Sequence, residues 1–334
     1  MRGPAVGSGR EETISAALGI RTPMEEGARL VLETSAALKV GEKVLILADE
    51  TTRTVGDAFV GAARSLGTDP VLVCIGPRKR DGDEPPDPVS VAMENADVVV
   101  LVTSRSLTHT HARRQANRAG ARVISVPGVT EDMLRAGGLA ADWSEVHEIL
   151  RRTARRLRGA RDVRLTSASG TDLTFSVAAR DWITEDTGLC ARKGAFTTLP
   201  AGELFIAPVE DSAEGRLVAD LYFGEPLLES ATAVLSQGHA TRIVGAAKAV
   251  HEMNLGGRDA RTLGRFGFGL NRHARINGPH PEAEKALGCA NLGFGDNLVI
   301  GGKIHCGVRV EATISEVGIQ VDGRSIVEKG RLVE

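Results

Sequence analysis

The sequence predicts an α/β fold with an N-terminal doubly wound parallel α/β domain and a C-terminal, mostly β domain of the α+β kind. Three observations predict it. In the first half, short β-branched runs alternate with helical stretches, which is typical of parallel sheets with right-handed crossovers. Beyond about Val163 the segments become short, alternating and rich in glycine, which favours antiparallel strands. The 334 residues suffice for two hydrophobic cores, and we place the domains at 1–160 and 161–334.

Strands in the first half are expected where apolar, β-branched runs lie next to turn residues. These runs are EKVLILAD (42–49), DPVLVCIG (69–76), ADVVVLVTS (96–104) and ARVISVPG (121–128). Helices are expected over 54–67 and 111–120, each ending in a glycine that can adopt the left-handed conformation of a helix C-terminus. No glycine-rich phosphate-binding turn follows the first run, so the sequence does not predict an NAD site.

The second half predicts one long helix and then mainly strands. Residues 142–164 predict a helix with an arginine-rich face, which we interpret as solvent-exposed, with a nucleic-acid patch as the alternative. Residues 163–177 alternate around ASGTD and predict a β-hairpin. Further helices are expected over 240–253 and at the start of HPEAEKALG (280–288).

The composition argues against nucleic-acid and membrane partners. A net charge of −2 and an aromatic content of 3% provide neither a basic surface nor stacking platforms for nucleic acid. The longest apolar run, ADVVVLV, is too short to cross a bilayer, and the first ten residues lack the apolar core of a signal peptide. The four cysteines show no C-x-x-C spacing, so neither a redox motif nor a disulfide framework is indicated. We therefore expect a cytoplasmic protein whose partner is a small molecule.

Two histidines follow the third predicted strand, in SLTHTHARRQA. Ligands of open α/β sheets bind beyond the carboxyl ends of the strands, so His109 is a candidate for catalysis and His111 for substrate binding. Residues two apart on a helix point to different faces, and we expect only His109 to face the active cleft between the domains. The ordinary alternative is one capping or surface histidine and one exposed histidine.

Two charged residues of the second half stand in apolar surroundings. Glu203 lies between a Pro-Gly turn and the run LFIAP, and Arg265 lies in LGRFGFGLN. A buried charge requires a partner of opposite sign or hydrogen bonds, and a guanidinium favours a carboxylate. An exposed turn residue is the common alternative for Glu203.

The remaining histidines carry weaker signals. His147 and His251 lie in predicted helices, and we expect them to be structural or exposed. His273 and His280 stay open. In HPEAEKALG the two nearby acids are explained by a favourable interaction with the helix dipole.

The order of several segments resembles that of the thermophilic-type metallo-aminopeptidases. These segments are GEKVLILAD, SLTHTHARR, LPAGELFIAP, LGRFGFGLN, EKALG and GFGDN…GGKIH. They are similar still more closely to the related 2,5-dihydroxypyridine 5,6-dioxygenases, which are iron enzymes. The resemblance extends from about residue 27 to the end of the chain, and LPAGE followed by AP is its most specific element. It implies the two-domain fold of these families and a homo-oligomer.

The resemblance also implies a metal site, whose ligand positions can be followed along the chain. The Glu of the L-P-x-x-E motif is Glu203, and the position of a Glu after L-G is Arg265. The position of a strand His is Asn291, and the closing His-x-Asp pair is His305 with Gly307 in place of the Asp. Because Asn and Gly are poor ligands for transition metals, we expect no metal cofactor.

The charges support that expectation. Carboxylates packed together require a cation, and Arg265 can supply it, so we predict that its guanidinium lies within hydrogen-bonding distance of Glu203. Two alternatives stay open. One is a single Fe, Zn or Mn ion held by Glu203 and His305. The other is a site rebuilt from Cys289, Cys306, Asp296 or His280.

These observations favour an enzyme that acts on a small polar metabolite, either amino-acid-derived or N-heterocyclic. It would act by acid/base chemistry such as hydrolysis, ring opening or cyclisation. An altered site suggests a role in specialised metabolism. The alternatives are a metal-dependent aminopeptidase or ring-cleaving dioxygenase with altered ligands, and a non-catalytic binding protein. The catalytic candidates are Glu203, His305 and His109, and the substrate-binding candidates are Arg265, Asn291, Asp296 and His111.

Overall fold

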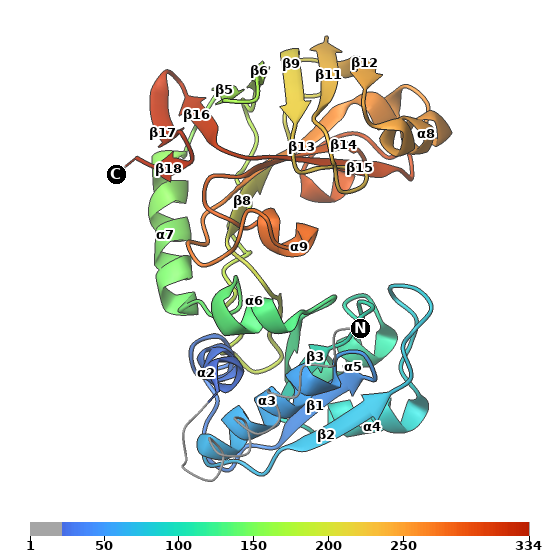
Figure 1. The fold of residues 1–334 in the computed structure, drawn as a ribbon, viewed down its shortest axis with the longest axis vertical. Helices are drawn as coiled ribbons and strands as arrows, with labels where there is room; N and C mark the ends of the chain where they lie inside the picture. Colours follow the sequence, from blue (N-terminus) through green and yellow to red (C-terminus); the bar gives the residue numbers. More distant parts are fainter. Residues whose placement is uncertain (1–21, 334) are drawn as a thin grey trace, which may run out of the picture. The chain divides into compact units, whose positions relative to one another are not determined.

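The structure is a computed structural model that describes residues 22–333 (Figure 1). The described residues form two compact units. The first ends at Ser144 and also includes Gly188–Leu199, and the second comprises Glu145–Thr187 and the chain from Pro200 onward. Residues 145–160, which the sequence predicted in the first domain, therefore group with the second unit.

A five-stranded parallel sheet forms the centre of the first unit, in the order β2-β1-β3-β4-β7. Four strands lie in the runs expected from the sequence, whereas the fifth comes from the segment that returns from the second unit. With only three residues, that strand gives no periodic signal of its own. The strands are β1 (Val44–Asp49), β2 (Val71–Ile75), β3 (Val98–Val102), β4 (Arg122–Ser125) and β7 (Phe196–Thr198).

Helices cover both faces of this sheet, as the doubly wound prediction requires. Leu45 and Leu47 of β1 pack in a core with residues of α4 and α5. Ile46 and Ala48 point to the other face, where Gly56 of α3 lies so close that an added Cβ would be 3.1 Å from the side chain of Ala48. The helices are α2 (Pro23–Leu30), continued by a π-helical turn at Val31–Ser35, α3 (Arg53–Ser65), α4 (Asp87–Glu94), α5 (His111–Ala119) and α6 (Glu131–Ala136).

The second unit contains two antiparallel sheets. The five-stranded sheet has the order β10-β15-β14-β13-β8, and the eight-stranded sheet has the order β12-β11-β9-β6-β5-β16-β17-β18. The strands of the first are β8 (Glu203–Ile206), β10 (Tyr222–Phe223), β13 (Leu263–Gly269), β14 (Ala290–Gly295) and β15 (Arg309–Ile314). Those of the second are β5 (Asp162–Ser167), β6 (Asp172–Ser176), β9 (Glu214–Ala219), β11 (Ala231–Ser236), β12 (His239–Val244), β16 (Val317–Val321), β17 (Arg324–Glu328) and β18 (Arg331–Leu332).

Three α-helices accompany these sheets in the described chain: α7 (Trp143–Arg156), α8 (Ala247–Leu255) and α9 (His280–Ala283). The hairpin of β5 and β6 and the short helix at His280 are confirmed. The arginine-rich helix expected over 142–164 is confirmed as far as Arg156, whereas residues 162–164 belong to β5. The helix expected over 240–253 is wrong in its first half, because the β-branched residues up to Val244 pair with β11.

The two sheets of the second unit pack through aromatic side chains. The ring centroids of Phe175 in β6 and Phe266 in β13 lie 5.0 Å apart, and Trp182 contacts both Phe266 and Phe268 edge-on. Since side chains alternate along a strand, Arg265 and Gly267 point to the opposite face of the five-stranded sheet.

No helix among residues 22–333 is long and apolar enough to span a membrane. The first ten residues, in which no signal peptide was expected, lie outside the described residues.

Candidate active site

Two glycines create space for charged side chains on the face of the five-stranded sheet that Arg265 shares. Arg265 of β13 is paired with Gly293 of β14, and Gly267 is paired with Asn291. A Cβ added at Gly267 would overlap Oε1 of Glu203, and one at Gly293 would lie 3.0 Å from the Cβ of Arg265. The glycines of GRFGFG and NLGFG thus allow a buried cluster of charges to form.

Glu203 is fully buried at the start of β8, and both its carboxylate oxygens are engaged. Oε1 accepts hydrogen bonds from Nη2 of Arg265 at 2.7 Å and from Nδ2 of Asn291 at 3.1 Å. Oε2 accepts from Nζ of Lys285 at 2.7 Å. The predicted pair of Glu203 and Arg265 is confirmed, and Lys285 is a second cation that the sequence interpretation missed. Glu203, Arg265, Lys285, Asn291 and Asp186 are called the Glu203 cluster below.

The ammonium group of Lys285 lies among three carboxylates. Its Nζ is 2.7 Å from Glu203, 3.0 Å from Oε1 of Glu284 and 3.3 Å from Oδ2 of Asp186. Asp186 also accepts the backbone N–H of Glu203 at 3.1 Å. A protein cation therefore occupies the place among these acids where a metal ion would be needed to balance their charge.

The pKa values in the cluster follow from burial and these ion pairs. Burial opposes ionisation of Glu203, but the charges of Arg265 and Lys285 outweigh it and lower its pKa to about 2. For Lys285, burial is likewise outweighed by Asp186 and Glu203, and its pKa is raised. The pKa of Arg265 is also raised, because Glu203 outweighs burial. Glu203, Arg265 and Lys285 are all charged at neutral pH.

Two nitrogen atoms of the Arg265 guanidinium are left without a hydrogen bond. Its Nε and Nη1 atoms are buried and have no hydrogen-bond partner, and the same holds for Oε2 of Glu311. Nη1 and that oxygen are 3.9 Å apart, too far for a direct hydrogen bond. The guanidinium also lies over the ring of Phe205, 4.5 Å from its centroid. A small group that both accepts and donates hydrogen bonds, such as a hydroxyl, matches this gap.

A chain of hydrogen bonds leads from Glu203 to a histidine. Nδ2 of Asn291 binds Glu203, so its Oδ1 is the acceptor for the hydroxyl of Thr313 at 2.9 Å. Having donated its one proton, Thr313 must accept from Nε2 of His280 at 3.1 Å. The neutral His280 ring therefore carries its proton on Nε2 and has a free lone pair on Nδ1. The ring is stacked on Tyr222, with centroids 3.8 Å apart.

A cavity of about 260 Å³ lies beside this histidine. Tyr222, paired with Thr313 across β10 and β15, lines it together with His280. Its other walls are largely apolar, with Leu221, Pro226, Leu227 and Ile276 among them. Such a cavity, with few polar groups, suits a small ring-containing ligand.

His305 lies elsewhere, which corrects the predicted pairing with Glu203. Its side chain is 77% exposed, and its Nδ1 is 3.8 Å from Oδ1 of Asp296. Asp296 follows β14 and accepts the backbone N–H groups of Cys306 and Gly307. It is five residues from Asn291, about 17 Å along an extended strand. His305 therefore cannot share a metal ion or a proton with Glu203.

His109 and His111 belong to the first unit, and both are exposed. The helix begins at His111 with Thr110 as its N-cap, so His109 precedes it. The carboxylate of Glu84 accepts the backbone N–H groups of His111 and Ala112. The role of His109 as a second base, and of His111 in substrate binding, stays a prediction.

Some residues of the site had sequence signals that could have identified them. Lys285 stands in the EKALG segment, directly after Glu284, and Tyr222 is the single tyrosine of the chain. No sequence pattern around Thr313 or Asp186 marks either residue as part of the site. Thr313 is brought there by strand pairing and Asp186 by the path of the chain before β8.

The residues at Glu203 do not fit a metal centre. Both oxygens of Glu203 are occupied by cations and an amide, and Asn291 uses both ends of its amide to bind Glu203 and Thr313. Cys289 is buried, and burial raises the pKa of its thiol to about 12. Among residues 22–333 no three or more His, Cys, Asp or Glu side chains are grouped so that they could hold a metal ion.

Comparison with known proteins gives one family. Residues 28–334 match the family model of 2,5-dihydroxypyridine 5,6-dioxygenase. The enzyme of that name from Pseudomonas putida KT2440 is 25% identical over 260 residues, which is 72% of each chain.

Two solved structures share the fold. The dihydroxypyridine dioxygenase of Pseudomonas putida KT2440 has a TM-score of 0.69 at 20% identity, over 93% of this chain and 96% of that one. AmpT from Thermus thermophilus has a TM-score of 0.65 at 17% identity, over 93% and 99%. At these identities the likeness shows the fold alone.

Proposed function

The chain belongs to the 2,5-dihydroxypyridine 5,6-dioxygenase family, and we propose that it is an enzyme that opens the ring of a small, hydroxylated nitrogen heterocycle. The single observation that carries this proposal is the family match over residues 28–334. It is supported by a cavity beside His280 and by unused hydrogen-bonding atoms on the same face of the sheet.

A ring hydroxyl of the substrate is bound between Arg265 and Glu311. The hydroxyl accepts from Nη1 of Arg265 and donates to Oε2 of Glu311, which satisfies atoms that are otherwise buried without partners. When the proton moves to Glu311, the resulting oxyanion stays paired with the guanidinium. His280, with its free Nδ1, is positioned to accept a second proton from a ligand in the cavity.

Glu203 acts here as a positioning residue. Its carboxylate is ionised and all its hydrogen bonds are made within the cluster, so it is a poor proton acceptor. By binding Nη2 of Arg265 it holds the guanidinium in place and leaves Nη1 for the substrate. This replaces the acid/base role first predicted for Glu203.

A second reaction of the same site is ring opening by water or cyclisation, driven by proton transfer alone. The position of the Lys285 ammonium among three carboxylates favours it, because the acids that would attract a metal ion are already balanced. A non-catalytic binding protein is the third possibility carried over from the sequence. We also retain the proposals of a cytoplasmic homo-oligomer with a role in specialised metabolism.

Dioxygen uptake distinguishes these reactions. Purified protein is incubated with 2,5-dihydroxypyridine and a panel of other hydroxypyridines and cyclic amides, with and without dioxygen, while ring absorbance and dioxygen are followed. Loss of the ring with equal dioxygen uptake identifies oxidative cleavage, and loss without uptake identifies the proton-transfer reaction. Saturable binding without turnover would contradict both.

The role of Glu311 is tested with Glu311→Gln and a matched control, Glu328→Gln, on the exposed surface of β17. Loss of a general base lowers kcat by about 10²- to 10⁴-fold. We expect a loss in this range for Glu311→Gln and unchanged kcat for Glu328→Gln. Equal activity of the two variants would remove Glu311 from the reaction.

A further inference from the structure

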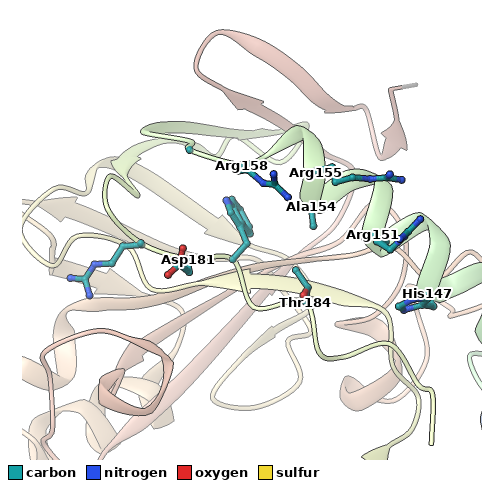
Figure 2. Close-up of a pocket in the computed structure, with 10 residues that line it drawn as sticks. His147, Arg151, Ala154, Arg155, Arg158, Asp181 and Thr184 are labelled. Carbon is teal, nitrogen blue, oxygen red and sulfur yellow. The ribbon is translucent and has the colours of Figure 1, made fainter. Parts of the chain in front are cut away.

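A second cavity, of about 330 Å³, lies in the second unit between α7 and the segment 180–184 (Figure 2). His147, Arg151, Ala154 and Arg155 follow one face of α7 at helical spacing, and Arg158 continues this row beyond the helix end. Figure 2 shows Asp181 and Thr184 on the opposite wall.

We infer that this arginine pocket, defined as the cavity lined by these residues together with Arg180 and Trp182, binds a small oxyanion, either a carboxylate or a phosphate ester. The inference goes beyond the ring-opening reaction and does not use the Glu203 cluster.

The donors of the pocket exceed the acceptors available to them. Nε1 of Trp182 is buried and has no hydrogen-bond partner, and an indole nitrogen can only donate. Arg158 has no ion pair with any acid among the described residues. Asp181 is the one acidic side chain in the lining. The lining therefore carries an excess of positive charge, which suits a ligand rich in hydrogen-bond acceptors.

Two further arginines are free to turn toward such a ligand. Arg151 and Arg155 share one acid, Glu148, at 3.3 Å and 3.5 Å, and all three side chains are about half exposed. Exposed pairs of this kind are weak, so a bound anion can compete with Glu148. Arg180 differs, because its side chain is only 12% exposed and is paired with Glu210 at 2.6 Å, and it remains with that partner.

The wall of the pocket leads directly to the Glu203 cluster. Trp182 packs on Phe266 and Phe268, on the face of β13 opposite to Arg265. Ile183 exchanges backbone hydrogen bonds with Phe205 of β8, and Asp186, three residues later, contacts Lys285. The segment 181–186 therefore connects the pocket to the Glu203 cluster through the backbone.

Calorimetric titration of the full chain, without ring substrate, tests the inference. Orthophosphate, methyl phosphate and malonate are titrated at constant ionic strength, so that the phosphate and carboxylate sources are compared. We expect saturable binding of at least one, weakened about tenfold by Arg158→Gln because a charge-assisted hydrogen bond is lost. Trp182→Phe keeps the packing but removes the donor, and should weaken binding roughly threefold.

Arg152→Gln is the matched control, since Arg152 is exposed on the same helix but does not line the pocket. It should leave affinity unchanged. Absence of saturable binding, or equal weakening by Arg152→Gln and Arg158→Gln, would overturn the inference. So would tighter binding of a DNA duplex that both variants weaken equally, which would identify a nucleic-acid surface instead. Since no ring substrate is present, failure here leaves the proposed reaction standing.

Discussion

The two ends of β14 use polar residues in opposite ways. At one end, Asn291 is buried and joins Glu203 to Thr313 within a group of charged side chains. At the other end, Asp296 accepts backbone N–H groups of the following loop, and His305 is exposed. The resemblance in the sequence implied that both ends belong to one site, whereas Asn291 and His305 have different partners.

The difference lies in which hydrogen bonds remain unmade. Asp296 is paired with the loop that it closes, and these backbone hydrogen bonds hold its pKa below the usual value. The Glu203 end retains buried donors on Arg265 and a buried acceptor on Glu311. Unused buried hydrogen-bonding atoms call for a partner, and on this ground we propose that the Glu203 end is the functional one.

Of the substitutions at the two ends of β14, Glu203→Gln should destabilise the protein most. Arg265 and Lys285 would remain buried without their shared counter-charge. Removing one partner of a buried ion pair costs about 3–5 kcal/mol, so we expect the free energy of unfolding in urea to fall by this amount. A loss below about 1 kcal/mol would show that the two cations are stabilised by other groups.

Replacing Arg265 with Lys tests whether the reaction needs only the positive charge of Arg265 or also the fixed positions of its N–H groups. The ammonium keeps the positive charge near Glu203, but it cannot hold Glu203 and also donate to the substrate hydroxyl from the fixed position of Nη1. Loss of such a contact lowers kcat/KM by about 100-fold, and we expect this loss in steady-state assays of the ring reaction. Wild-type kinetics in this variant would mean that only the charge of Arg265 matters.

Acid unfolding should reveal the ionised Glu203. Its pKa is 4.5 in the reference state and about 2 in the folded protein. A lowered carboxyl pKa stabilises the fold fully above the unfolded value, and the stabilisation is lost as pH falls through the folded value. Between pH 4.5 and about 2 the free energy of unfolding should therefore fall more steeply in the wild type than in Glu203→Gln. Parallel slopes would contradict the assignment.

Replacing His305 with Ala should have the smallest effect. Its side chain is 77% exposed and its nearest acid, Asp296, is held by backbone groups. Exposed substitutions of this kind change the free energy of unfolding by less than about 0.5 kcal/mol. We expect urea unfolding and kcat/KM to match the wild type, and a large loss of activity would return His305 to the site.

The sequence predicted the elements and one ion pair of the site, because these follow from local patterns. β-Branched runs gave four strands of the parallel sheet, and a carboxylate and a guanidinium in apolar strands gave Glu203 with Arg265. The prediction for His305 was wrong because it relied on closeness in the sequence. His305 follows Asn291 in the chain, but it lies beyond the opposite end of β14.

Site residues that strand pairing or loop paths bring to Glu203 could not be predicted from the sequence. Thr313 meets Asn291 only through the register of β14 and β15. Lys285 reaches Glu203 because the loop before β14 is held in place. The backbone N–H of Asn271 donates a hydrogen bond to the carbonyl oxygen of Lys285. No local periodicity encodes either contact.

Metal content tests most directly whether protein cations have replaced the metal at Glu203. Wild-type protein and the variants Glu203→Gln and Arg265→Glu are dialysed against Fe(II), Zn(II) or Mn(II), then against metal-free buffer, and analysed by mass spectrometry of the elements. We predict no stoichiometric metal in any of them, because Arg265→Glu restores a carboxylate but leaves Asn291 and Gly307 in ligand positions. About one metal ion per wild-type chain that is lost in Glu203→Gln would contradict this prediction.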